Sequence, residues 1–164
     1  MTGPALTSSA NAKVAALRKT FDTLLIDLLA ATGASRATLR LDDEALGLHS
    51  DDVVAEALAP GEESMRGAGG INHRAAETAQ WLERHRTLLV QNDFDSGPVA
   101  PEKLRGHFGV KAQMLAPVIR VGRLDGWVSI HEAKARRNWS DADKAAIMEV
   151  AQAVIDELAR ASIK

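Results

Sequence analysis

Residues 109–132 read GVKAQMLAPVIRVGRLDGWVSIHE, and this stretch decides the fold of the chain. Two runs of mainly aliphatic residues, 113–121 and 124–131, flank Gly122, which is the pattern of an antiparallel β-hairpin. Pro117 interrupts the first run. Because proline has no backbone N–H to donate, we expect that strand to lie at a sheet edge or to contain a bulge.

The second strand of this hairpin has two different faces, because successive side chains of a strand alternate. Trp127, Ser129 and His131 share one face, and Val128 and Ile130 share the other. The aliphatic face predicts packing against helices, whereas the mixed face is typical of a small-ligand cavity. We expect the tryptophan to stack on a ligand, the serine to hydrogen-bond it and the histidine to sense its polarity or charge. The alternative is a core tryptophan and a histidine bonded to a carbonyl at the strand end.

A long helix is predicted near the start of the chain. Apolar residues recur at steps of three and four, which predicts an amphipathic helix over 11–31 that ends at Gly33. Residues 1–10 are small and polar, and we expect them to form a mobile tail.

The rest of the chain alternates between strand and helix patterns. Residues 36–41 place Ala and Leu alternately with Arg and Thr, which is typical of a half-buried strand. The shorter elements expected next are a strand at 52–58, a loop at 59–72, a helix at 74–86, a strand at 87–91 and a short helix at 101–107. Ser140 and Asp143 have the spacing of a capping box, which predicts the start of a last long helix. Together these patterns predict a single α+β domain over 11–164, with helices at both ends of a mostly antiparallel sheet.

Composition excludes several kinds of function. The 164 residues carry a net charge of −2, which gives no electrostatic reason to expect nucleic acid or an anionic membrane surface as a partner. The chain has no Cys, so disulfides, thiolate catalysis and Cys-type metal sites are absent, and a reducing cytoplasm fits. No apolar run is long enough to span a membrane, and no signal peptide is evident. The histidine spacings match no metal motif, so we expect no metal site.

The hairpin and the segment after it resemble one known family. Residues 109–132 are similar to the closing strands of GAF domains, and 136–143 (RRNWSDAD) to the aromatic residue and cap that begin that family's last helix. Residues 88–93 look like its third strand. The resemblance covers about residues 14–160 and is most specific over 107–143, so the chain is identified as a lone GAF domain.

This resemblance implies a fold and a type of site. GAF domains have a twisted antiparallel sheet with the N- and C-terminal helices on one face. The other face forms a pocket for a small molecule under loops and short helices. In this chain the segments 59–74 and 92–106 would cover the pocket.

Residues 107–132 look most like the GAF domains of phytochrome-like photoreceptors. His131 stands where a histidine faces the chromophore, and Gln113 and Leu115 fall where side chains of the preceding strand face the same pocket. The chain lacks the chromophore-attaching Cys, and Pro101 stands where some relatives have another pocket histidine. We therefore expect neither a linked nor a free bilin, and no cofactor. The missing Cys also argues against the GAF-type methionine sulfoxide reductases.

Four more side chains are candidates for the pocket on weaker grounds. Trp81 could point into it from a helix or could anchor the core. Asp93 and Phe94 follow the strand next to the expected pocket, although aspartate is also a common turn-former. His107 could line the pocket mouth or lie in an exposed loop.

Three functions remain open. The preferred one is a sensory domain in which a small organic ligand orders the covering loops and the change passes through the terminal helices to a separate signalling partner. The second is a dimeric scaffold or adaptor whose pocket is filled by its own side chains. The third is a small-metabolite enzyme or carrier with His131 and Asp93 or His107 as acid–base candidates. Broad apolar stripes on both terminal helices predict a homodimer.

Overall fold

A computed structural model describes residues 8–67 and 72–162 of the chain. Its centre is a five-stranded sheet in the order β2-β1-β5-β4-β3, in which every pair of neighbours is antiparallel. The strands are β1 (Arg36–Leu41), β2 (Ala55–Leu58), β3 (Leu89–Gln91), β4 (Ala112–Arg120) and β5 (Arg123–Glu132). Helices complete an α+β fold, as the sequence predicts.

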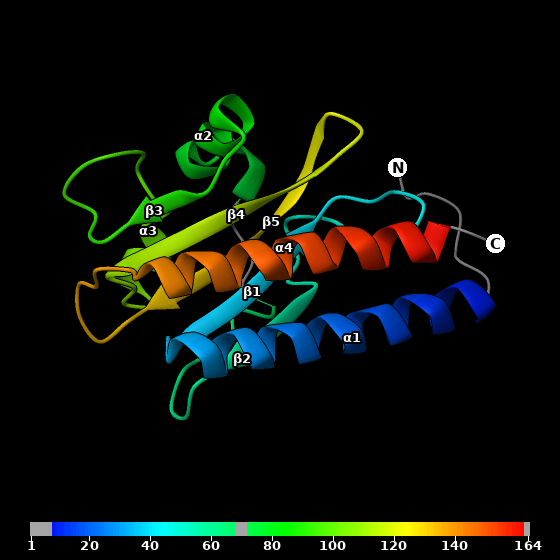
Figure 1. Cartoon of the computed structure of the whole chain (residues 1–164), viewed down its shortest axis with the longest axis horizontal. Helices are drawn as coiled ribbons and strands as arrows, with labels where there is room; N and C mark the ends of the chain where they lie inside the picture. Colours follow the sequence, from blue (N-terminus) through cyan, green and yellow to red (C-terminus); the bar gives the residue numbers. More distant parts are fainter. Residues whose placement is uncertain (1–7, 68–71, 163–164) are drawn as a thin grey trace.

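Two long helices cover one face of the sheet. Helices α1 (Ser8–Thr32) and α4 (Asp141–Ser162) lie side by side there, with the start of α1 and the end of α4 at the same end of the molecule (Figure 1). The predicted stop at Gly33 is confirmed: its φ is +66° and its N–H bonds the Leu29 carbonyl at 2.8 Å. Helix α1 begins three residues earlier than predicted, and residues 1–7 of the expected tail lie outside the described residues.

Apolar residues from both helices meet the aliphatic face of the sheet. Val128 and Ile130 lie in this core with Phe21, Leu25 and Val154, and all five are fully buried. The predicted capping box begins α4, since the Asp143 N–H bonds the Ser140 hydroxyl and the Ser140 N–H bonds the Asp143 carboxylate, each at 3.0 Å.

The predicted hairpin is confirmed as β4 and β5. Val121 (φ +50°) and Gly122 (φ +73°) form its two-residue turn, because the favoured tight turn of a hairpin needs positive φ at both positions. Pro117 lies on the part of β4 beyond its pairing with β3, which involves only residues 113–115, and next to a register shift at Val118 and Ile119. The missing N–H therefore leaves no strand partner unsatisfied.

Short elements cover the other face of the sheet. They are a 3₁₀ turn η1 (His73–Ala75), helix α2 (Glu77–His85) and helix α3 (Glu102–Gly106). The helix predicted at 74–86 is thus divided at Ala76, whose extended backbone (ψ 146°) ends one turn and begins the next.

Strand β1 differs from the prediction. All six of its residues are buried, although the alternation of Arg and Thr with Ala and Leu predicts a face open to water. The reason is its position between β2 and β5 under the covering elements, so that its polar side chains face a second interior layer.

Candidate functional site

A cavity lies between the sheet and the elements that cover it. The space within it that is open to water is about 40 Å³, which is room for a few water molecules. Its lining combines polar and apolar side chains from β1, β4 and β5, from the start of α2 and the region of α3, and from Met65 and residues 73–76. These are Thr38, Arg40, Met65, His73, Ala76, Thr78, Pro101, Leu104, Gln113, Leu115, Trp127, Ser129 and His131.

The five candidates from the hairpin all lie in this wall. Strand β5 contributes Trp127, Ser129 and His131, as their shared face predicts. The β4–β5 register places Leu115 opposite the serine and Gln113 opposite the histidine. The alternation of side chains along the hairpin strands therefore predicted which face of the sheet lines the cavity.

Strand β1 adds two residues that the sequence analysis missed. Thr38 and Arg40 line the cavity, and the β1–β5 register places them opposite Ser129 and Trp127. Arg36 stands in the same row, opposite His131. The β1–β5 pairing is the signal that would have found them, because strand partners point to the same face.

Arg40 brings a buried charge to the cavity. It is 5% exposed, and its one hydrogen bond within the described residues runs from Nη1 to the Ser50 carbonyl at 3.1 Å. Burial lowers the pKa of this guanidinium to about 10, against the opposing effect of Asp51 and Asp52. Arg40 is therefore still charged at neutral pH.

Arg36 is buried more deeply, at 1% exposed. Its Nε and Nη2 donate to the Glu63 carbonyl at 3.3 and 2.8 Å, and its guanidinium lies 5.1 Å from the centre of the Phe108 ring. Its Nη1 is buried and has no hydrogen-bond partner in the part of the chain that the structure describes. Burial lowers the pKa of Arg36, although nearby Glu62 opposes this effect.

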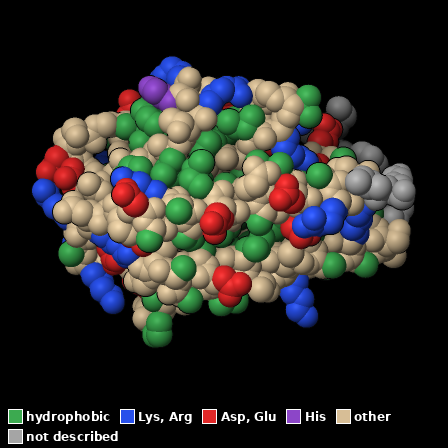
Figure 2. Space-filling model, viewed as in Figure 1, with side chains coloured by type: hydrophobic (Ala, Val, Ile, Leu, Met, Phe, Trp, Pro, Cys, Tyr) green, Lys and Arg blue, Asp and Glu red, His purple; other side chains and the backbone are tan. Residues whose placement is uncertain are grey.

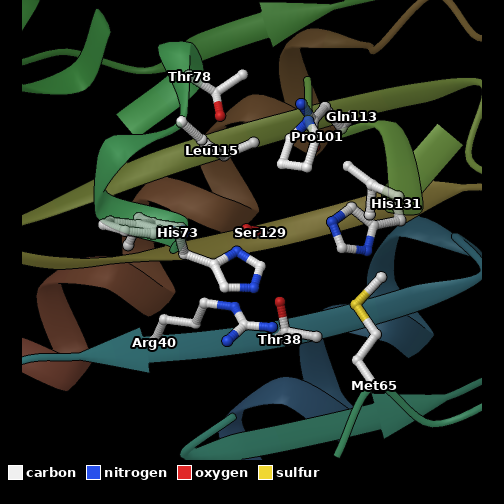
Figure 3. Close-up of a pocket in the computed structure, with 13 residues that line it drawn as sticks. Thr38, Arg40, Met65, His73, Thr78, Pro101, Gln113, Leu115, Ser129 and His131 are labelled. Atoms are coloured by element: carbon white, nitrogen blue, oxygen red, sulfur yellow. The ribbon is translucent and has the colours of Figure 1, made fainter. Parts of the chain in front are cut away.

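Two histidines face the same space (Figure 3). Burial and the nearby Arg36 and Arg40 charges lower the pKa of His131 well below 6.5. Burial and Arg40 lower the pKa of His73 to about 4. Both rings are therefore neutral at pH 7. The Nδ1 of His131 is buried and has no hydrogen-bond partner among the described residues, which is rare for a polar atom in a protein interior.

Trp127 belongs to the cavity wall and to a hydrophobic cluster at once. It is 4% exposed and packs in one cluster with Leu82, Leu89, Leu115 and Leu124. This packing agrees with the alternative interpretation given above, in which Trp127 is a core residue and not a ligand contact. In this conformation its ring is largely covered by the protein's own side chains.

The remaining four candidates lie elsewhere. Trp81 and Asp93 line a second hollow of about 370 Å³ beside β3, where Trp81 stacks on His85 with ring centres 4.1 Å apart. Phe94 packs against a small cluster that includes Phe108. His107 is half exposed, and its Nε2 lies 2.9 Å from the Glu63 carboxylate. The sequence grouped these residues with the cavity, but its lining includes none of the four.

Acid–base and metal chemistry find little support in this arrangement. His131 lines the cavity, Asp93 lines the second hollow and His107 points to Glu63, so the expected pairs do not converge. Within the described ranges no three His, Asp or Glu side chains gather as a metal ion would need. No helix in the described part of the chain is long and apolar enough to cross a membrane.

The sheet, the helical layer on one face and the covered cavity on the other define an α+β domain with an internal cavity. The family model of the GAF domain matches residues 16–158. The chain therefore belongs to the GAF domain family. A comparison with curated proteins finds no match.

Solved structures of photoreceptor domains share this fold. The PixJ GAF domain of Thermosynechococcus elongatus, in its blue-light absorbing form, has a TM-score of 0.69 at 19% identity and covers 97% of each chain. The chromophore-binding domain of a Stigmatella aurantiaca bacteriophytochrome has a TM-score of 0.68 at 17% identity, over 93% of this chain and 60% of that one. A protein in a far-red absorbing dark state with bound biliverdin has a TM-score of 0.65 at 19% identity, over 93% of this chain and 97% of that one.

A bilin does not fit the residues present here. The chain has no Cys to form a thioether, and Pro101 occupies the cavity wall. The water-accessible space of about 40 Å³ is far below the roughly 300 Å³ at which pockets for drug-sized molecules begin. This geometry suits a much smaller molecule.

Proposed function

We propose that this GAF domain is a small-molecule-binding regulatory domain whose site is the cavity under η1, α2 and α3. The observation that carries the proposal is the buried, unpartnered Nδ1 of His131 in the cavity wall. A buried polar atom without a partner costs about 1–3 kcal/mol, and a bound polar molecule would remove that cost. The second hollow has no such atom among the described residues.

A route from this cavity to the terminal helices starts at the end of β5. Glu132, the neighbour of His131, accepts hydrogen bonds from Ser35 at 2.8 Å and from Arg137 at 3.1 Å. The same arginine binds Asp143 at the start of α4 at 3.1 Å.

Arg137 also reaches the end of α1, because its Nη2 donates to the Thr32 carbonyl. A displacement of β5 at His131 would therefore act on both long helices through one side chain. We propose this contact as the output of the domain, toward a separate signalling partner or a second subunit.

The test is to fill the cavity and follow the bound molecule. Native mass spectrometry of the purified protein, followed by denaturing release, identifies any molecule that copurifies. Ala76→Leu places a larger side chain in the cavity wall from a segment outside the sheet. Ala145→Leu on the exposed surface of α4 is the matched control.

We expect Ala76→Leu to fold, by circular dichroism, and to lose the copurifying molecule or the thermal shift it produces. Ala145→Leu should keep both. Retention of the molecule by folded Ala76→Leu would contradict the assignment of the cavity as the site.

A ligand-free scaffold is the second candidate. The small volume of the cavity and the packing of Trp127 against Leu82 and Leu89 favour it. A purified protein without any bound molecule, and without a thermal shift in a metabolite screen, would support the scaffold instead.

A further inference from the structure

The side chains that line the cavity include one cation, two neutral imidazoles and no carboxylate among the described residues. Arg40, His73 and His131 line it, and its lining contains no aspartate or glutamate. Arg36 adds a second guanidinium directly opposite His131 on β1. Figure 3 shows the Arg40, His73 and His131 side chains directed into one space, with the Thr38 hydroxyl beside the Arg40 guanidinium.

The positive charge of Arg40 is not neutralised by a contact within the described residues. Its one hydrogen bond goes to the neutral Ser50 carbonyl, and the carboxylates of Asp51, Asp52 and Glu56 act on it only from beyond ion-pair distance. An isolated charge in a protein interior is costly, and proteins normally pair such a charge with an anion. Among the described residues, one cavity therefore has a cation and an imidazole nitrogen without a partner, and its lining holds no anion.

The net charge of the lining and the volume of the cavity restrict which anions could bind there. Both imidazoles are neutral at pH 7, which leaves Arg40 as the charged group in the lining. One guanidinium matches one carboxylate in charge and in its two-pronged geometry, whereas a phosphate dianion would bring an unbalanced charge. A space of about 40 Å³ holds on the order of three to five non-hydrogen atoms.

We infer that the ligand of this cavity is a small organic carboxylate whose carboxylate group binds the Arg40 guanidinium, with His131 Nδ1–H as a further hydrogen-bond donor. This inference rests on the proposed function and adds the ligand's chemical class. Thr38 and Ser129 place hydroxyl groups in the same wall, and Leu115 and Trp127 supply its apolar part.

The test compares probes that differ only in charge. Acetate and propionate are titrated at constant ionic strength against acetamide and propionamide, with inorganic phosphate as a third arm. Binding is measured by thermal shift and by the NMR signals of the His131 and His73 rings. We expect the carboxylates to bind about tenfold or more tightly than the amides and to shift the His131 ring nitrogens.

Variants of Arg40 then test whether its guanidinium binds the carboxylate group. Arg40→Met should weaken propionate binding about tenfold or more, and Arg40→Lys should keep part of it, because the charge remains but the fork is lost. Arg160→Gln removes a cation that is 65% exposed on the far layer and should leave binding unchanged. Since Arg40→Met removes an unpaired buried charge, it is expected to fold at least as stably as the parent protein.

Each other outcome overturns the inference in a distinguishable way. Equal binding of amides and carboxylates at the His131 ring would reject the anion and leave the proposed function intact. Tighter binding of phosphate would assign a different anion. Unchanged carboxylate binding in Arg40→Met would show that Arg40 does not bind the carboxylate group. A cavity that binds none of these probes, in a protein that also carries no copurifying molecule, would reject both the inference and the proposed function.

Discussion

Glu132 and Arg137 form an ion pair of 3.1 Å at the point where β5 meets both long helices. Burial by itself would raise the pKa of Glu132, but hydrogen bonds from Ser35, the Lys134 N–H and Arg137 outweigh burial and lower it. The arginine lies over Trp139 as well, with its guanidinium 4.4 Å from the ring centre. Arg137 thus joins the end of β5 and the start of α4 to the end of α1, which is distant in sequence.

Loss of this cation should destabilise the domain. Arg137→Met removes the partner of Glu132 and Asp143, two carboxylates that are about one-tenth exposed. We expect the free energy of unfolding in urea to fall by about 2–3 kcal/mol.

The matched control is Arg136→Met. Among the described residues Arg136 pairs with Asp95 alone, at the surface, and both side chains are more than 60% exposed. This variant should change stability by less than about 0.5 kcal/mol. Similar losses in the two variants would argue that the Arg137 contacts add nothing specific.

The buried histidines should make the protein less stable in mild acid. Burial and Arg36, Arg40 and His73 lower the pKa of His131 well below 6.5, and burial and Arg40 lower that of His73 to about 4. Below pH 6.5 these two histidines become protonated in the unfolded chain but stay neutral in the folded chain. The free energy of unfolding therefore falls as the pH drops from 6.5 toward 4.

His131 alone contributes a slope of up to about 1.4 kcal/mol per pH unit in that window. Urea unfolding at pH 7 and pH 5 measures the slope. The variant His131→Gln should flatten it, whereas His85→Gln, at an exposed position of α2, should not. An unchanged slope in the first variant would mean that His131 is protonated in the folded protein.

Gly126 allows the close approach of β1 and β5 beside the cavity. A Cβ at this position would lie 1.9 Å from the Arg40 carbonyl oxygen, which belongs to the sheet backbone and cannot move aside alone. We expect Gly126→Ala to lower the free energy of unfolding by about 3 kcal/mol. It should also weaken the binding of any ligand that contacts Arg40.

Gly106→Ala serves as its control, because a Cβ there meets nothing within 4 Å and its backbone needs no positive φ. Chemical denaturation of the two variants gives the comparison. Equal stability of both would contradict the close approach of the two strands.

The homodimer predicted from the terminal helices remains a prediction. Most of the apolar stripe of α1 is packed within the subunit, but Ile26 on α1 is 57% exposed and Met148 on α4 is 44% exposed. Charged side chains of both signs are mixed with hydrophobic ones on this helical face (Figure 2). Ile26→Glu should therefore convert a dimer to a monomer in light scattering. Val121→Glu, at the exposed hairpin turn, should not. A parent protein that is already monomeric would end this prediction.

The sequence predicted those parts of the fold that depend on local chemistry. The capping box of Ser140 and Asp143 and the turn at Gly122 require particular side chains at particular positions. The shared face of Ser129 and His131 follows from strand geometry alone.

The polar side chains of β1 were predicted to face water. A strand whose polar face lines a cavity has the same alternation of polar and apolar residues as a strand whose polar face meets solvent. The burial of Arg36 and Arg40 depends on β5 and on the covering elements, which are distant in sequence. Trp81 and Asp93 line a different hollow from the hairpin residues, and the sequence could not show this, since proximity in sequence does not give the side of β3 on which they lie.

The strand order also bears on how the chain is made. In the sheet β2-β1-β5-β4-β3, the inner neighbour of β1 is β5, which is synthesised long after it. Until residues 123–132 emerge from the ribosome, α1, β1 and β2 have an apolar surface with no partner, and Arg36 and Arg40 have no interior to enter. The N-terminal third must therefore wait for β5 before it can complete its packing. A nascent chain stalled before β5 would expose that surface to chaperones and proteases.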